Sequence, residues 1–194
     1  MSHEEIVGWE GFAVALVGAA AVLSGLLFVA VSLNMERILR IRTLPGRAGE
    51  SVIIFLGVLV ECAYLLIPHQ SPTALAVELI ATGLVMWALL MAIAVPATRA
   101  PTRQPRAWHI TRLVVVQGAT VPVVLSGFAV LGWMPGGLYW LAFAVLFALC
   151  AATGNAWVLL VEVVRDERYG PVDEESGQRS SDVPPASSAQ DRFR

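Results

Sequence analysis

The sequence contains no lysine and little charge of either sign. Only 14% of its 194 residues are charged, 57% are hydrophobic, and the mean hydropathy is +0.69. Soluble domains are usually about 25% charged and about 45–50% apolar, so the composition excludes an ordinary soluble domain and indicates a membrane protein. The formal net charge of −2 also excludes the broad positive field typical of nucleic-acid-binding proteins.

Residues that carry out chemistry are scarce as well. The three histidines, His3, His69 and His109, lie outside the long apolar segments, so there is no HExxH zinc motif and no histidine-activated nucleophile. P-loop and GxGxxG patterns are also absent. Cys62 and Cys150 lie in separate segments without CxxC spacing, which favours two small buried apolar residues over a metal or redox site. We therefore expect no enzyme, no cofactor and no metal site.

Five apolar segments dominate the rest of the chain, and each is close to the roughly 20 residues that a membrane-crossing helix needs. They cover residues 11–33, 51–67, 72–95, 113–133 and 138–164. The second is the shortest and contains Glu61, whose insertion costs about 2.5–3.5 kcal/mol; its large apolar residues outweigh that cost at about 0.3–0.6 kcal/mol each. The sequence predicts an all-α, multi-pass bundle of five transmembrane helices over residues 11–165 in a bacterial cell membrane.

The arginines predict how this bundle is oriented. They cluster in the first loop, in the third loop and after the last span: Arg37, Arg40, Arg42, Arg47, Arg99, Arg103, Arg106, Arg112, Arg165 and Arg168. The second and fourth loops and the segment before the first span contain none. Since positive residues stay in the cytoplasm, we expect residues 1–10 outside the cell and the C-terminus inside. The first span lacks a positive flank and is too long for a typical signal peptide, so we expect it to be retained.

Other features agree with this orientation. Four aromatic residues fall at the expected outer boundaries, where such side chains favour the interface: Trp9, Trp133, Tyr139 and Trp140. Residues 96–108, rich in proline and arginine, predict an irregular loop. Residues 166–194 are rich in Ser, Pro, Asp and Glu and predict a disordered cytoplasmic tail, because they cannot bury enough apolar surface to fold.

Two glutamates lie inside apolar segments. Pro68 ends the second span and the Ser71–Pro72 pair begins the third, so Glu61 and Glu78 both lie roughly 9–10 Å from the outer boundary, at about 1.5 Å per residue. If they face each other they would share a proton and form an ion or proton site with the nearby Tyr64 and Thr82. Alternatively, they bond to those residues or to backbone, or reach the interface. The choice depends on helix rotation, so both interpretations stay open.

Other polar and small residues predict contacts between helices. Asn34, Gln117 and Asn155 lie in the inner halves of their spans and favour interhelical hydrogen bonds of about 0.6 kcal/mol each; a polar pathway is the alternative. Ala21 and Gly25 in the first span have the small-xxx-small spacing that is typical of helix packing or dimerisation.

Two stretches carry a resemblance: SGLLFVAVSLNMERIL at residues 24–39 and IPHQSPTALAVELI at residues 67–80. With the apolar span between them, they resemble a family of small actinobacterial integral membrane proteins that is loosely labelled modulators of the membrane-anchored AAA protease. The likeness covers most of residues 10–95 and implies a part in membrane-protein quality control.

Two functional hypotheses follow. The first is a non-enzymatic interaction or regulatory protein whose partners are the lipid bilayer and a membrane protein or a second copy of itself, without nucleic acid. The alternative is a small oligomeric proton or cation channel or transporter that uses Glu61 and Glu78.

Overall fold

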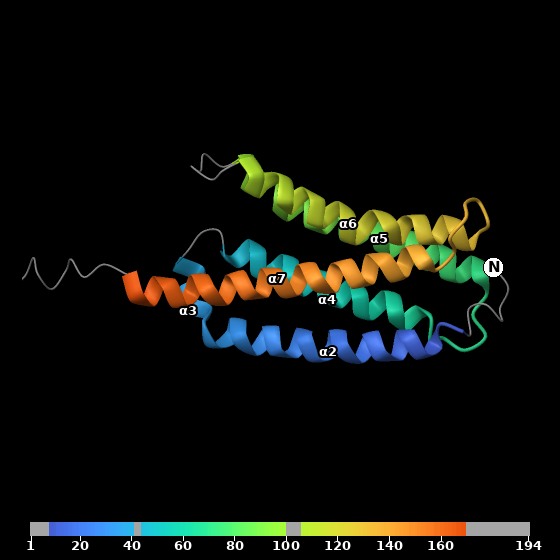
Figure 1. Ribbon diagram of the computed structural model, residues 1–194, viewed down its shortest axis with the longest axis horizontal. Helices are drawn as coiled ribbons and strands as arrows, with labels where there is room; N and C mark the ends of the chain where they lie inside the picture. The colour runs from blue at the N-terminus through green and yellow to red at the C-terminus, as the bar shows by residue number, and fades with distance from the viewer. Residues whose placement is uncertain (1–7, 41–43, 100–105, 170–194) are drawn as a thin grey trace, which may run out of the picture.

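The computed structural model describes residues 8–40, 44–99 and 106–169, and within these ranges every regular element is a helix. Five long helices and one short helix follow in the order α2 (Glu10–Leu33), α3 (Met35–Arg40), α4 (Leu44–Tyr64), α5 (Pro72–Arg99), α6 (Arg106–Val130) and α7 (Tyr139–Tyr169) (Figure 1). The all-α class is therefore confirmed for the described residues.

Four of the long helices are apolar enough to cross a membrane. The candidate spans are Glu10–Leu33, Pro72–Val95, Ile110–Val130 and Tyr139–Val158, which makes this a multi-pass membrane protein. The second predicted span, residues 51–67, is helical up to Tyr64 but is not among these four. Any stretch of α4 long enough to cross a membrane includes Arg47, Glu50 and Glu61, and these charges offset its apolar residues.

Several helix ends differ from the prediction. α4 begins at Leu44 and ends at Tyr64, whereas the apolar run covers residues 51–67. α5 continues to Arg99 and α6 begins at Arg106, so most of the expected irregular loop 96–108 is helical and its centre lies outside the described residues. The helices extend past the apolar runs because helical hydrogen bonds stay intact where polar side chains meet water.

The start of α5 and the end of α7 test two further predictions. Pro72 is the first residue of α5, and the hydroxyl of Ser71 accepts a hydrogen bond from the amide of Ala74 at 3.2 Å, which confirms the predicted cap. α7 continues to Tyr169, so the first residues of the predicted tail 166–194 are helical. The rest of that tail lies outside the described residues.

The helices form a bundle with two distinct ends. At the aromatic end, defined by Trp9, Trp133, Tyr139 and Trp140, α2 and α7 begin near each other, and the rings of Trp9 and Tyr139 pack edge to face with centroids 5.0 Å apart. The opposite end, the arginine end, is defined here by Arg47 near the start of α4 and Arg112 near the start of α6. The aromatic residues expected at a common boundary thus lie at the same end of the bundle, and Trp9 and Tyr139 are in contact.

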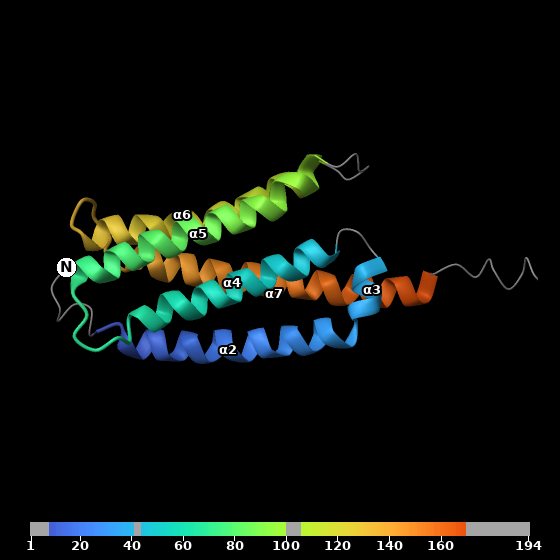
Figure 2. The ribbon, with the colours of Figure 1, turned by 180° about the vertical axis from the view of Figure 1, so that it is seen from behind.

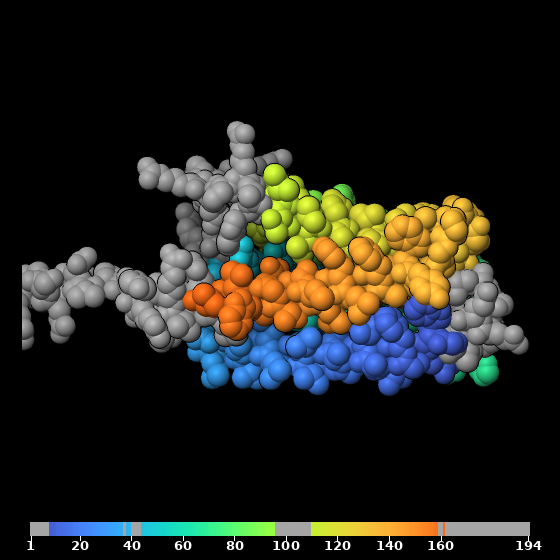
Figure 3. Space-filling model, in the orientation of Figure 1, coloured from blue at the N-terminus to red at the C-terminus, as the bar shows by residue number. Residues whose placement is uncertain are grey.

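The α5–α6 pair packs against one side of α4 and α7, and α2 covers the other side. In two opposite views the α5–α6 pair diverges from α7 toward the arginine end (Figures 1 and 2). On one face of the molecule α7 lies between α2 and α6 (Figure 3). α4 is central, because it contacts α2, α5 and α7.

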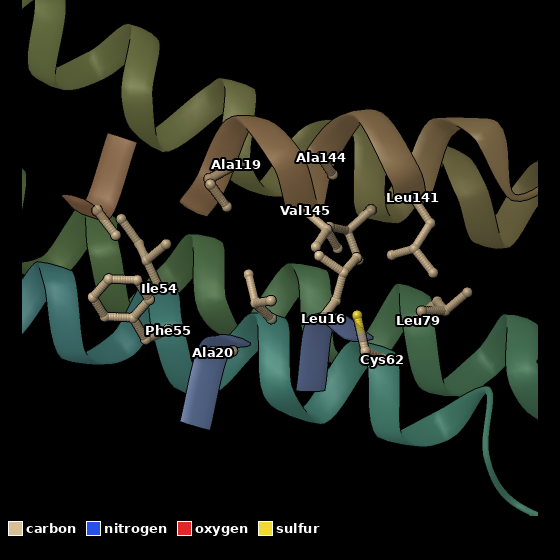
Figure 4. Close-up of a cluster of buried hydrophobic side chains, with 14 of the residues drawn as sticks. Leu16, Ala20, Ile54, Phe55, Cys62, Leu79, Ala119, Leu141, Ala144 and Val145 are labelled. Carbon is tan, nitrogen blue, oxygen red and sulfur yellow. The ribbon is translucent and has the colours of Figure 1, made fainter. Parts of the chain in front are cut away.

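The core is built from side chains of all five long helices. Figure 4 labels ten of them: Leu16, Ala20, Ile54, Phe55, Cys62, Leu79, Ala119, Leu141, Ala144 and Val145. Cys62 is buried as expected, whereas Cys150 is exposed on the opposite side of α7 from the core, so the expectation that both thiols are buried is wrong for Cys150.

Glycines bring neighbouring helices close together. A methyl group added at Gly83 of α5 would lie 2.8 Å from Cγ2 of Val124, and one at Gly127 of α6 would lie 2.8 Å from the carbonyl oxygen of Ala76. A methyl group at Gly57 of α4 would collide with the side chain of Met86 in α5. Without a hydrophobic driving force between helices in lipid, such close approach is a main source of helix association.

Candidate functional site

One face of α4 carries two buried carboxyl groups. Glu50, Ile54, Gly57 and Glu61 follow one another at intervals of four, three and four residues, so they share a helix face, and all four are buried. Gly57 lies against Met86 of α5, and Glu50 reaches Arg112 of α6. This face of α4 therefore points toward the α5–α6 pair.

Glu61 is 1% exposed, and its Oε1 has no hydrogen-bond partner among the described residues. It lies one turn beyond Gly57, where α4 packs on its neighbours. Burying an unpartnered polar group is unfavourable, and ionisable residues inside membrane helices are generally expensive and functional. Glu61 is thus a candidate site residue, because packing alone does not account for it.

Tyr64 and Thr82 are brought together by the structure. Their hydroxyl oxygens are 3.0 Å apart, in a hydrogen bond that joins the end of α4 to α5. Tyr64 is three residues after Glu61, so this bond lies about one turn further toward the aromatic end. The two hydroxyl groups bond to each other, next to Glu61 along the helix.

Glu78 has different surroundings. It is half-buried, and its Oε2 accepts a hydrogen bond from the side-chain amide of Gln70 in the loop before α5. The Gly57–Met86 and Tyr64–Thr82 contacts align the two antiparallel helices, and in that register Glu78 lies about one turn nearer the aromatic end than Glu61. Figure 2 shows α5 beginning beyond the end of α4.

The directions of the side chains increase this separation. Side chains lean toward the N-terminus of their own helix, and α4 and α5 run in opposite directions. Glu61 therefore leans toward the arginine end and Glu78 toward the aromatic end. The expectation of equal depth does not hold, and the arrangement in which the two carboxyl groups share a proton is not the one observed.

A second polar region lies at the arginine end, where a cavity of about 390 Å³ opens among α4, α5, α6 and α7. Its polar lining consists of Arg47, Glu50, Thr111, Arg112 and Asn155. Its apolar lining consists mainly of Ile54, Leu90, Val115, Val116 and Val158. We call it the arginine-end cavity.

An ion pair forms one wall of the arginine-end cavity. Nε of Arg112 donates to Oε1 of Glu50 at 2.5 Å, and Nη2 of the same arginine also contacts that oxygen. Both side chains are largely buried, so the pair links α4 to α6 inside the protein. Hydrogen bonds between charged groups are among the strongest in proteins, and this one fixes the position of the Arg112 guanidinium.

This ion pair was not predicted from the sequence, where Arg47 and Arg112 served only as signals of orientation and Glu50 falls one residue before the second predicted span, 51–67. The detectable signal was the spacing: Glu50 lies eleven residues before Glu61, which is the same face of any helix that continues upstream of the apolar run.

The remaining predicted polar residues are dispersed. The side-chain amide of Asn34 donates to the carbonyl of Ala30 in its own helix at 2.9 Å. Oε1 of Gln117 accepts a hydrogen bond from the indole of Trp87 at 3.2 Å, which connects α6 to α5. Asn155 lines the arginine-end cavity. Of these three residues, only Gln117 makes a side-chain hydrogen bond to another helix within the described part of the chain.

Within the described residues, no group of three or more His, Cys, Asp or Glu side chains could hold a metal ion.

Comparison with known proteins gives no family for this chain, because no family model, no curated protein and no solved structure matches it.

Proposed function

We propose that this is a non-enzymatic integral membrane protein with an interaction or regulatory role, and that it binds another transmembrane helix through α2. The observation that carries this proposal is a glycine face on α2, made of Gly11, Gly18 and Gly25. Seven residues are close to two helical turns, so the three share one face. A methyl group added at any of them would meet nothing within 4 Å.

The glycine face lies opposite the packed side of α2. The buried residues of this helix are Ala13, Leu16, Ala20 and Leu27, and at about 100° per residue they point about half a turn away from the glycines. Glycine inside a helix is destabilising by about 0.5–1 kcal/mol relative to alanine. Contacts within the bundle give no reason for three glycines here, whereas a second helix approaching closely would.

The cellular setting belongs to the same proposal. The arginine distribution supports a bacterial cell membrane location with the N-terminus outside and the C-terminus in the cytoplasm. The resemblance to modulators of the membrane-anchored AAA protease suggests membrane-protein quality control as the process. The partner is then either a second copy of the chain or another membrane protein.

The test is photo-crosslinking of the full chain in native membranes. The crosslinking amino acid replaces Val22, which is exposed and lies beside the glycine face; amine-reactive reagents are unsuitable because the chain has no lysine. We expect one stoichiometric adduct, lost in Gly18→Leu and Gly25→Leu. Ala88→Leu adds bulk at an exposed position of α5 and should leave the adduct intact. Equal adduct yield in all variants would contradict the proposal.

The second candidate function is a small oligomeric proton or cation channel, and the unpartnered carboxyl of Glu61 favours it. Flux into proteoliposomes under a pH or potassium gradient tests this function. Since Glu78 bonds to Gln70 near the aromatic end, we expect Glu61→Gln to abolish flux and Glu78→Gln to reduce it less. Absence of flux above empty liposomes, with folded wild-type protein, excludes a conduit.

A further inference from the structure

We propose that the arginine-end cavity binds an anionic phospholipid, with the headgroup phosphate at Arg47 and Arg112 and the acyl region along the apolar lining. This site is separate from the glycine face of α2, and its binding chemistry does not depend on the proposed function.

Charge supports a phosphate ligand. The lining of the cavity includes the guanidinium groups of Arg47 and Arg112 beside the carboxyl of Glu50. A phosphodiester is an anion, and each guanidinium carries five N–H donors, so each can bind a phosphate oxygen while it keeps its contacts within the protein. Arginine suits this task because its planar guanidinium presents several donors to phosphate oxygens. Glu50, which is 4% exposed, holds the Arg112 guanidinium at the cavity wall.

Size and lining favour a lipid over a free phosphate ion. A volume of about 390 Å³ lies in the range of roughly 300–1,000 Å³ found for small-molecule sites. A phosphate ion would leave the lining formed by Ile54, Leu90 and Val115 without a partner. Glycerol and the first part of an acyl chain would cover these side chains, and the amide of Asn155 offers a donor to an ester or phosphate oxygen.

The position of the cavity fits a lipid that enters from the bilayer. It is lined by α4, α5, α6 and α7, at the end of the bundle where Figures 1 and 2 show the α5–α6 pair diverging from α7. In the orientation proposed above, this is the level of the cytoplasmic headgroups, where anionic lipids attract basic residues at about 1 kcal/mol each. The choice of leaflet rests on that proposed orientation, but lipid binding itself does not.

The test measures lipid binding to the full chain. Delipidated protein is placed in nanodiscs of phosphatidylcholine alone or of phosphatidylcholine with phosphatidylglycerol. Native mass spectrometry then counts retained lipids, and thermal unfolding reports stabilisation. We expect one retained phosphatidylglycerol and a higher Tm in its presence. Inorganic phosphate with phosphatidylcholine nanodiscs forms a separate arm and should give no shift in Tm.

Two variants change the cavity without removing a partner of the ion pair. Arg47→Gln removes one positive charge, and Gly154→Leu fills space, since a methyl group at Gly154 meets nothing within 4 Å. Arg47→Gln should weaken phosphatidylglycerol binding by about tenfold, the effect of losing one hydrogen bond to a charged group. Gly154→Leu should also weaken binding, because its side chain occupies part of the cavity. Cys150→Leu is the matched control on the exposed side of α7 and should bind like wild type.

Three outcomes would overturn the proposal. Unchanged phosphatidylglycerol binding in both cavity variants would place the lipid elsewhere on the protein. Equal stabilisation by inorganic phosphate would make the ligand a free anion. Equal retention of phosphatidylcholine and phosphatidylglycerol would show that the arginines do not select an anionic headgroup.

Discussion

Glu50 and Glu61 lie on the same face of the same helix, and both are almost fully buried, yet their surroundings differ. Glu50 contacts Nε and Nη2 of Arg112, which links α4 to α6. Glu61 has an oxygen without a hydrogen-bond partner among the described residues. Burial alone therefore does not assign a role to a carboxyl group. Glu50 belongs to the architecture, whereas Glu61 has no structural explanation and is therefore a candidate for function.

The largest effect is expected when Arg112 is replaced by leucine. Glu50 would then be a buried charge without its partner, which costs about 3–5 kcal/mol in the free energy of unfolding. Unfolding can be followed by thiol labelling of the buried Cys62 in a Cys150→Ser background. The double variant Glu50→Leu with Arg112→Leu should recover most of that stability, because apolar replacement of a whole buried pair is often neutral. A single variant as stable as wild type would show that the pair contributes nothing to the fold.

A smaller effect of opposite sign is expected at Glu61. Glu61→Leu replaces an unpartnered buried carboxyl with an apolar side chain and should stabilise the protein by about 1 kcal/mol, because the desolvation penalty is removed. The matched control is Glu50→Leu, which leaves Arg112 unpaired and should destabilise. The same thiol-labelling measurement applies to both. Marked destabilisation by Glu61→Leu would make Glu61 structural and remove the contrast with Glu50.

The smallest effect is expected at the Tyr64–Thr82 hydrogen bond beside Glu61. Tyr64→Phe should lower the free energy of unfolding by about 0.6 kcal/mol, which is typical of side-chain hydrogen bonds between membrane helices. Combining it with Thr82→Val in a double-mutant cycle isolates the interaction. Additive losses in the cycle would mean that the two hydroxyl groups do not depend on each other.

Much of the fold could be predicted from the sequence because apolar length and turn residues act locally. Four predicted spans coincide with long apolar helices, and the Ser71–Pro72 start of α5 was located to the residue. α4 was harder, since its first turns carry Arg47 and Glu50 and continue the helix beyond its apolar run. Composition therefore identified the centre of this helix and missed its beginning.

The site was less predictable because it depends on helix rotation. Sequence spacing placed Glu61 and Glu78 near one end of their helices, but the Tyr64–Thr82 and Gly57–Met86 contacts set a register that separates the two carboxyl groups. The partner of Glu50 is Arg112, 62 residues later in the chain. No local pattern indicates such a pairing, since it exists only once α4 and α6 are packed in the same bundle.

The position of α7 has a consequence for biogenesis. α7 contacts α2, α4 and α6, and it lies between α2 and α6 on one face (Figure 3), yet of the helices described it is the last to be synthesised. Before α7 enters the membrane, the α2–α4 and α5–α6 pairs meet through α4, which packs on α5 and reaches α6 through the Glu50–Arg112 ion pair; α7 then adds a second connection. Chains that stop before Tyr139 thus lack the helix that joins the two halves, and they expose to lipid the apolar surfaces that Leu141 and Val145 cover in the finished protein.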